Sequence, residues 1–194
     1  MKWSRAIHHV ETLAQACTET MGPSIYSLRV TGLWAAGDLL EPPQDRDWVR
    51  VALTVDQPAA DVPWFGVPRG SQHWANAVRL TKNPVTPWWR SVHAPVWNHR
   101  IVRPVLVWDS AGGIREEVLE ALRDGRIEEL RPPAPGDDEY RERMRAELAV
   151  SLAALRASTE AYDRRRWSPG KLEPVADELW RASDGYLDVL AAQP

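Results

Sequence analysis

Apolar side chains recur with helical spacing at both ends of the chain. Residues 3–20 form one such stretch, which Met21-Gly22-Pro23 ends, and residues 137–165 form a longer one. A third stretch begins near Leu172, after a turn at Trp167-Ser168-Pro169-Gly170. The pattern predicts one amphipathic helix at the start of the chain and a helical hairpin at its end. The residues expected to face inward are Trp3, Ile7, Val10, Leu13, Ala14 and Cys17 in the first helix, Tyr140, Met144, Leu148, Leu152 and Leu155 in the second, and Val175, Leu179, Ala182, Tyr186, Val189 and Leu190 in the third.

Two strands and one further helix are predicted in the middle of the chain. Residues 48–56 alternate between apolar and more polar positions, which is the period of a half-buried strand. Residues 100–108 form a second, more apolar strand. Asp109-Ser110 is expected to cap a helix over residues 114–124, and Gly125 is expected to terminate it.

The remaining segments have weaker patterns. Residues 25–30 and 33–37 fit either a strand and a turn or a short helix. Prolines and glycines predict a loop over residues 57–70. Residues 74–80 are predicted to form a strand, and residues 84–93 a short helix or an irregular segment.

The order of these elements predicts the fold class. A strand that leads directly into an amphipathic helix is typical of α/β or α+β folds. Pro132-Pro133-Ala134-Pro135-Gly136 cannot continue a helix or a sheet, so it predicts an internal boundary. We therefore expect an α/β domain over residues 1–131, followed by a C-terminal helical hairpin over residues 137–194 that packs on it.

Composition narrows the classes of function. The chain of 194 residues is 44% hydrophobic, enough for one ordinary core. A formal net charge of −3 argues against a protein that binds nucleic acid in bulk. The absence of an apolar signal core and of a long apolar run predicts neither secretion nor a membrane span. The single cysteine, Cys17, excludes an intramolecular disulfide and fits a cytoplasmic location.

Charge is unevenly distributed along the chain. Residues 62–108, the acid-free segment, contain no Asp or Glu but hold five Arg, one Lys, three His and six of the eleven Trp. Cationic side chains beside flat rings suit a nucleotide or another anionic small molecule. The alternative is structural: because Phe65 is the only phenylalanine, tryptophan must supply much of the aromatic core.

Asp45-Arg46-Asp47 stands immediately before the predicted strand over residues 48–56. Carboxylates two residues apart on an extended chain point to the same side, so Asp45 and Asp47 are candidate ligands for Mg²⁺ held against a triphosphate. The alternative interpretation of such a pair is a solvated turn.

These residues resemble a motif of the nucleotidyltransferase superfamily, in which a Gly-Ser turn precedes an Asp-x-Asp that opens a strand. Leu33-Trp34-Ala35-Ala36-Gly37-Asp38 occupies the turn, and Asp45-Arg46-Asp47-Trp48-Val49-Arg50-Val51 follows it. The resemblance covers roughly residues 5–130 and implies a mixed sheet with flanking helices. Later strands, a helix and C-terminal helices follow in the order that the superfamily shows.

Two features of the superfamily pattern are missing. The turn has no serine, and the predicted strand over residues 74–80 contains no third acid. The resemblance therefore implies a degenerate nucleotidyltransferase-like protein that binds a nucleotide with weak or no transfer activity, and its catalytic residues are unknown. The candidate ligand-binding residues are Arg79, Lys82, Trp89, Arg90, His93, Asn98, His99 and Arg100.

Two other interpretations concern this same segment. His73, His93 and His99 have no cysteine or acid among them, and their spacing does not favour a zinc site. The alternative function is a non-catalytic protein-interaction module, in which the basic Trp-rich segment meets an acidic protein and the C-terminal helices provide a homo- or hetero-oligomeric surface.

Overall fold

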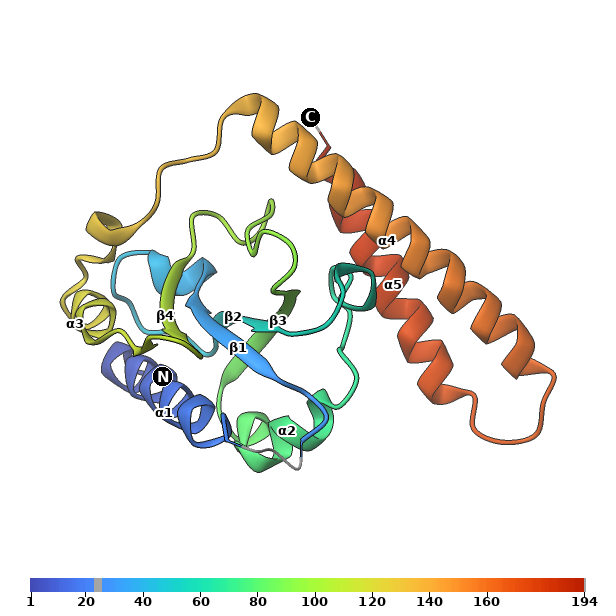
Figure 1. Ribbon diagram of the computed structural model, residues 1–194, viewed down its shortest axis with the longest axis horizontal. Helices are drawn as coiled ribbons and strands as arrows, with labels where there is room; N and C mark the ends of the chain where they lie inside the picture. Colours follow the sequence, from blue (N-terminus) through green and yellow to red (C-terminus); the bar gives the residue numbers. More distant parts are fainter. Residues whose placement is uncertain (23–25, 194) are drawn as a thin grey trace.

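The computed structural model describes residues 1–22 and 26–193 and has a five-stranded mixed sheet with a long helical hairpin at one end (Figure 1). The strand order is β3-β2-β1-β4-β5, and only β2 and β3 are parallel neighbours. Pro23 and Ile25, at which a helix break and the start of an element were expected, lie outside the described residues. The strands are β1 (Val30–Ala35), β2 (Val49–Val55), β3 (Val85–Ser91), β4 (Val105–Asp109) and β5 (Gly113–Ile114).

Most predictions for the longer elements are confirmed. The helices are α1 (Trp3–Glu19), α3 (Glu116–Asp124), α4 (Asp137–Arg166) and α5 (Glu173–Ala191). Gly125 ends α3 with φ 70°, a left-handed conformation that glycine adopts without steric cost. The fold class is the expected one, α+β with a mixed sheet and a C-terminal helical pair.

Two predictions between the parallel strands were wrong. Residues 74–80, expected to be a strand, lie mostly in helix α2 (Ser71–Ala77), while residues 84–93, expected to be helical or irregular, contain β3. A helix is the natural connection here, because parallel neighbours cannot be joined by a tight turn. Trp74 and Ala75 are buried and anchor α2 on the sheet.

Pro87 lies inside β3 and explains why the sequence pattern did not predict this strand. The position of Pro87 in the sheet explains why the strand tolerates a proline. The backbone carbonyl of Pro84 accepts a hydrogen bond from Val49, and the backbone N–H of Val92 donates one to Val55. The backbone groups of the even-numbered residues in this segment are therefore directed at β2. Pro87 is therefore directed at the open edge, where it removes no hydrogen bond of the β2–β3 pair.

The expected helix cap also differs. Asp109 does not cap α3, whose N-cap residue is Arg115. Instead the Asp109 carboxylate accepts hydrogen bonds from the backbone N–H groups of Ala111 and Gly112, and so stabilises the turn between β4 and β5. Ile114, expected to be the first residue of the helix, pairs with Trp108 as part of β5, so the helix begins at Glu116 instead.

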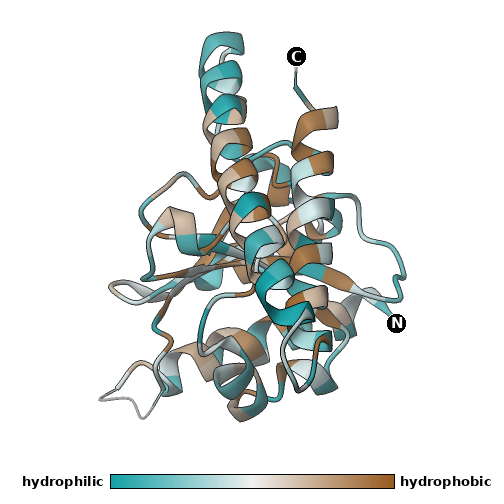
Figure 2. Ribbon diagram, turned by 90° about the vertical axis from the view of Figure 1, so that its right-hand side faces the viewer, coloured by the Kyte–Doolittle hydropathy of each residue, from teal (hydrophilic) through white to brown (hydrophobic). Residues whose placement is uncertain are grey.

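Hydrophobic residues fill both faces of the sheet, and brown segments lie near the centre of the molecule in Figure 2. The larger core joins one face to α1, α2 and α3, and it includes Cys17, whose thiol pKa is raised by burial. The smaller core joins the other face to the hairpin through Trp64, Ile101, Met144 and Val189. Three of the tryptophans with the lowest exposure, Trp64, Trp74 and Trp108, thus belong to the core, as the structural alternative required.

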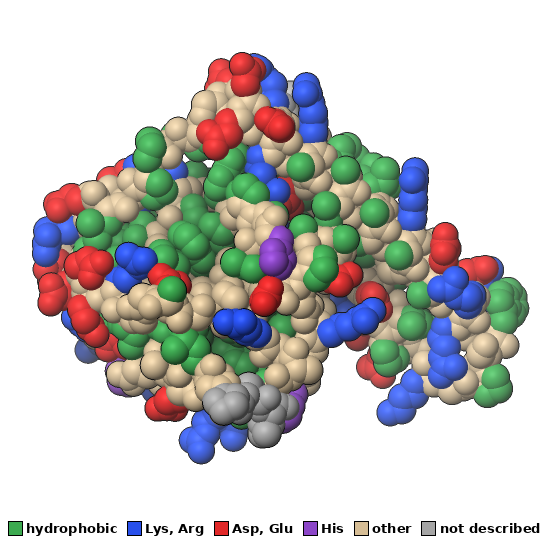
Figure 3. All heavy atoms as spheres, viewed as in Figure 1, with side chains coloured by type: hydrophobic (Ala, Val, Ile, Leu, Met, Phe, Trp, Pro, Cys, Tyr) green, Lys and Arg blue, Asp and Glu red, His purple; other side chains and the backbone are tan. Residues whose placement is uncertain are grey.

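The hairpin helices α4 and α5 pack on each other and extend past the sheet (Figure 1). Met144, Ala182 and Val189 are buried as expected, whereas Leu190 is exposed and does not face inward. Figure 3 shows blue and red side chains together at the tip, where Arg164 pairs with Glu160 and Arg166 with Asp163. Two of the arginines at the tip are thus paired with acids of the same helix.

Candidate functional site

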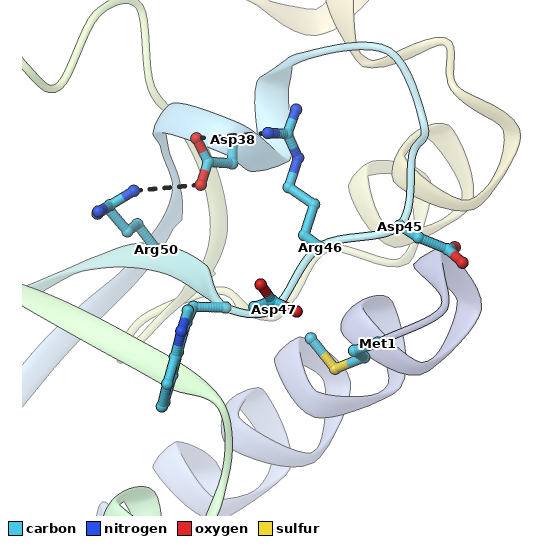
Figure 4. Close-up of a pocket in the computed structure, with 7 residues that line it drawn as sticks. Met1, Asp38, Asp45, Arg46, Asp47 and Arg50 are labelled. Atoms are coloured by element: carbon cyan, nitrogen blue, oxygen red, sulfur yellow. Dashed lines mark hydrogen bonds and ion pairs between the residues drawn. The ribbon is translucent and has the colours of Figure 1, made fainter.

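The expected acid pair lies in an open cleft where β2 begins, next to the 3-10 helix η1 (Gly37–Leu40) and the start of α1 (Figure 4). The cavity measures about 360 Å³. Its lining residues are Met1, Asp38, Asp45, Arg46, Asp47, Trp48 and Arg50.

Two guanidinium groups meet one carboxylate in this cleft. Asp38 Oδ2 accepts a hydrogen bond of 3.2 Å from Arg50, and Asp38 Oδ1 lies 3.9 Å from Arg46. The Nε of Arg46 is buried and has no hydrogen-bond partner, although its terminal nitrogen also pairs with Glu41. The cleft is thus lined by an arginine with one buried, unpaired nitrogen and by the exposed ring of Trp48.

Asp45 and Asp47 do not converge. Asp45 Oδ1 accepts the backbone N–H of Trp3 at 3.3 Å, and Figure 4 shows its carboxylate directed away from that of Asp47. Both side chains are exposed. Among the described residues, no group of three or more His, Cys, Asp or Glu is placed to hold a metal ion. A Mg²⁺ ion shared by the two acids would require one of them to rotate.

Arg90, expected to bind a ligand, lies instead in the junction between the sheet and the hairpin. Its guanidinium forms a two-pronged ion pair with Glu147 of α4, and its Nε donates to the carbonyl of Val96 at 3.1 Å. Arg143, one turn before Glu147, shares that carboxylate and also donates to the carbonyls of Pro95 and Trp97. The donors of Arg90 are thus directed at acceptors within the chain.

Three more candidate residues form a second contact with the hairpin. Asp188 of α5 lies 2.7 Å from Nε2 of His99 and accepts hydrogen bonds from Arg100 and from the indole of Trp64. Burial raises the pKa of Asp188, but these hydrogen bonds outweigh it and lower that pKa to about 2. The Asn98 side chain accepts from the backbone N–H groups of residues 100 and 101, which fixes the turn that carries His99 and Arg100.

The other four candidates are dispersed. Trp89 is buried in the larger core, edge-on to Trp74. His93 Nε2 lies 2.9 Å from the carboxylate of Asp56 at the surface. Arg79 and Lys82 are exposed, and within the described part of the chain their side chains form neither a hydrogen bond nor an ion pair. The cleft of Asp45 and Asp47 is lined by none of the eight candidates.

These contacts account for part of the charge segregation in the sequence. The acid-free segment supplies Arg90, His99 and Arg100 to the junction, and the hairpin supplies the acids Glu147 and Asp188 together with Arg143. An acidic partner for this segment was expected to be another protein. At this junction the acidic partner is the C-terminal hairpin of the same chain.

A groove at the edge of the junction was not predicted. It measures about 420 Å³ and runs between β3 and α5. Trp180 of α5 keeps 66% of its surface exposed beside it, and the ring of Trp88 lies 5.6 Å from that of Trp64. The Trp88-Trp89 pair was a sequence signal for this surface, but Trp180 is remote in the chain and gave none. The lining residues are Trp64, Phe65, Gly66, Val67, Thr86, Pro87, Trp88, Trp89, Trp180, Arg181 and Asp184.

Comparison with known proteins identifies a family and nothing further. The model of a family described as a domain of unknown function, DUF7711, matches residues 1–194. No curated protein and no solved structure matches the chain. Among the described residues, no helix has the length and apolar character needed to cross a membrane.

Proposed function

The chain belongs to the DUF7711 family, and we propose that it is a non-catalytic binding module that holds a partner protein in the groove between β3 and α5. The observation that carries this proposal is the groove itself. Four tryptophans and Phe65 line it, and Trp180 stands largely exposed at its rim. Tryptophan is one of the residue types enriched among interface hot spots.

The energetics favour a protein partner at this position. An exposed indole beside an apolar groove leaves a large apolar area in water, and burial stabilises a complex by roughly 25 cal/mol per Å². The framework around the groove favours a rigid surface, because Glu147 of α4 and Asp188 of α5 pair with arginines of the sheet region and the smaller core joins the hairpin to the sheet. A rigid groove loses little conformational entropy on binding.

The distribution of charge weighs against an anion at the acid-free segment. Arg90, His99 and Arg100 are already paired with carboxylates of the hairpin. A phosphate would have to displace those carboxylates and leave them without their partners. We therefore rank the protein-interaction function above nucleotide binding at these three residues, although Arg79 and Lys82 of the same segment are exposed.

Site-specific photocrosslinking tests the proposal with matched positions. Val67 lines the groove and is 52% exposed, whereas Val102 is 49% exposed and lies outside it. A photoreactive residue at position 67, irradiated in native cells, should form a protein adduct that disappears when Trp180→Ala is added. The same residue at position 102 should form none. Adducts that are equal at the two positions, or absent from position 67, would contradict the proposal.

A second candidate function has one observation in its favour. We propose that the cleft of Asp38, Arg46 and Arg50 binds a nucleotide, because the buried Nε of Arg46 has no partner and Trp48 offers an exposed ring. A phosphate between the two guanidiniums would replace Asp38, and a base would stack on the indole. Asp45 and Asp47 would hold Mg²⁺ after reorientation.

Calorimetry separates this candidate from the first. ATP, GTP, CTP and UTP are titrated in turn with Mg²⁺, and at least one is expected to give heat that Arg46→Gln abolishes. Arg141→Gln is the control, because Arg141 forms only an exposed ion pair with Asp138 on α4. Absence of heat for all four nucleotides would remove the candidate and leave the groove proposal intact.

A further inference from the structure

We infer that the partner held in the groove is a second copy of this chain, bound through α5 around a twofold axis. The inference rests on the proposed binding function of the groove and specifies its partner. Two observations carry it: a continuous apolar surface around the groove, and a pair of unmatched charges of opposite sign among the α5 residues that line it.

The apolar surface continues past the groove. A neighbouring hollow of about 370 Å³ shares Val67, Pro87 and Trp89 with the groove and reaches Trp48. Trp180, Val67 and Trp48 are all among the exposed large hydrophobic residues. One surface therefore runs from the outer side of α5, across the edge of β3, to the start of β2. A contiguous exposed apolar surface of this kind marks an association site.

The charges at the rim of the groove are self-complementary. Arg181 and Asp184 both line the groove and stand one turn apart on α5. Within the described residues neither forms an ion pair or a side-chain hydrogen bond, unlike Arg100 and Asp188 nearby. In a twofold interface, the same surface of the two copies meets. A surface that carries one unpaired cation and one unpaired anion can then form two ion pairs, each between the cation of one copy and the anion of the other.

A specific register follows from these positions. When two α5 helices cross antiparallel near Ala182 and Ser183, Arg181 of one copy lies opposite Asp184 of the other, and the reverse pair forms as well. Trp180 of each copy then lies beside the groove of the other. A partner with charge of a single sign would satisfy either Arg181 or Asp184 and leave the other unmatched.

Charge reversal gives a test that only a twofold interface passes. We expect wild-type protein to sediment as a dimer at high micromolar concentration. Arg181→Glu alone and Asp184→Arg alone each place like charges opposite each other twice, so each should raise the dimer Kd at least about tenfold. An equimolar mixture of the two variants should form a heterodimer, because both of its pairs are then opposite in sign.

Two further measurements make every outcome decisive. The chain that carries both changes should dimerise as wild type does, and circular dichroism should show that each single variant is folded. A wild type that stays monomeric up to submillimolar concentration, single variants that dimerise like wild type, or a mixture that stays monomeric would each overturn the inference. If wild type is monomeric but Val67 still crosslinks another protein in a Trp180-dependent way, only the second-copy inference fails.

Discussion

Two clusters of arginine and carboxylate in this molecule have similar chemistry and different surroundings. At the junction, Arg90 and Arg143 surround Glu147, whose side chain is 5% exposed. At the start of β2, Arg46 and Arg50 approach Asp38, whose side chain is 25% exposed and borders an open cleft. The comparison teaches that residue type alone does not separate a structural ion pair from a candidate binding cleft, whereas burial does.

The buried cluster is expected to tolerate little change. Burial lowers the pKa of Arg143, because the charged guanidinium is removed from water, while the carboxylate of Glu147 acts in the opposite direction. Each arginine also donates to backbone carbonyls of residues 95–97, which leaves few donors unsatisfied. The open cluster makes fewer contacts and contains one donor without a partner.

The largest effect is expected from Glu147→Ala. It leaves two buried arginines without their carboxylate, and breaking a buried pair in this way costs about 3–5 kcal/mol. Urea unfolding should report this loss of stability. Glu160→Ala is the control, because it removes only an exposed pair with Arg164 and should change the free energy of unfolding by less than about 0.5 kcal/mol. Equal losses in the two variants would mean that burial does not make the Glu147 cluster more important for stability than an exposed ion pair.

Gly185→Ala tests how closely the hairpin approaches the sheet. A Cβ at residue 185 would lie 2.3 Å from the carbonyl oxygen of Trp64, so α5 would have to move away from the loop that lines the groove. We expect a loss of roughly 1–3 kcal/mol in the free energy of unfolding, measured with urea. Gly136→Ala meets no atom within 4 Å and should be nearly neutral. A neutral result at residue 185 would mean that the junction is loosely packed.

Asp188→Asn tests the charged contact at the junction through the pH dependence of the free energy of unfolding. The folded-state pKa of about 2 lies below the value of about 3.9 for an unfolded aspartate, so the stabilisation is fully present above pH ~4 and is lost as the pH falls toward 2. At neutral pH the variant should lose roughly 1–2 kcal/mol, and its difference from wild type should shrink between about pH 4 and pH 2. Unfolding by urea at several pH values measures this. A difference that stays constant with pH would exclude the charged contact.

The smallest effect on stability is expected from Asp45→Asn combined with Asp47→Asn. Both acids are exposed and only Asp45 accepts a hydrogen bond, so the free energy of unfolding should change by less than about 0.5 kcal/mol. Thermal unfolding measures this directly. A large loss would assign these acids a structural role, which would make the open cleft resemble the junction and remove the contrast between them.

Periodic elements could be predicted from the sequence because their physics is local. The alternation in β2 and the helical spacing in α1, α3, α4 and α5 reflect which side chains face the core. The wrong predictions within residues 71–91 have a different cause. Helix α2 is too short to show a period, and the Pro87 of β3 is tolerated only because of its place at the sheet edge, which local sequence does not reveal.

The candidate site was harder to predict because its partners are remote in sequence. Arg90 and Glu147 are 57 residues apart, and His99 and Asp188 are 89 apart, so the acid-free segment gave no sign of the acids that it meets. The charge imbalance itself was a real signal. For Arg90, His99 and Arg100 it reflects contacts with acids of the hairpin.

A double-mutant cycle between Arg90→Met and Glu147→Ala tests most directly whether the arginines of the acid-free segment hold the hairpin. The free energies of unfolding of wild type, both single variants and the double variant are measured in urea. Because the two side chains share a buried, two-pronged contact, we expect a coupling energy of about 2 kcal/mol or more. Additive losses, with a coupling of less than about 0.5 kcal/mol, would contradict the account.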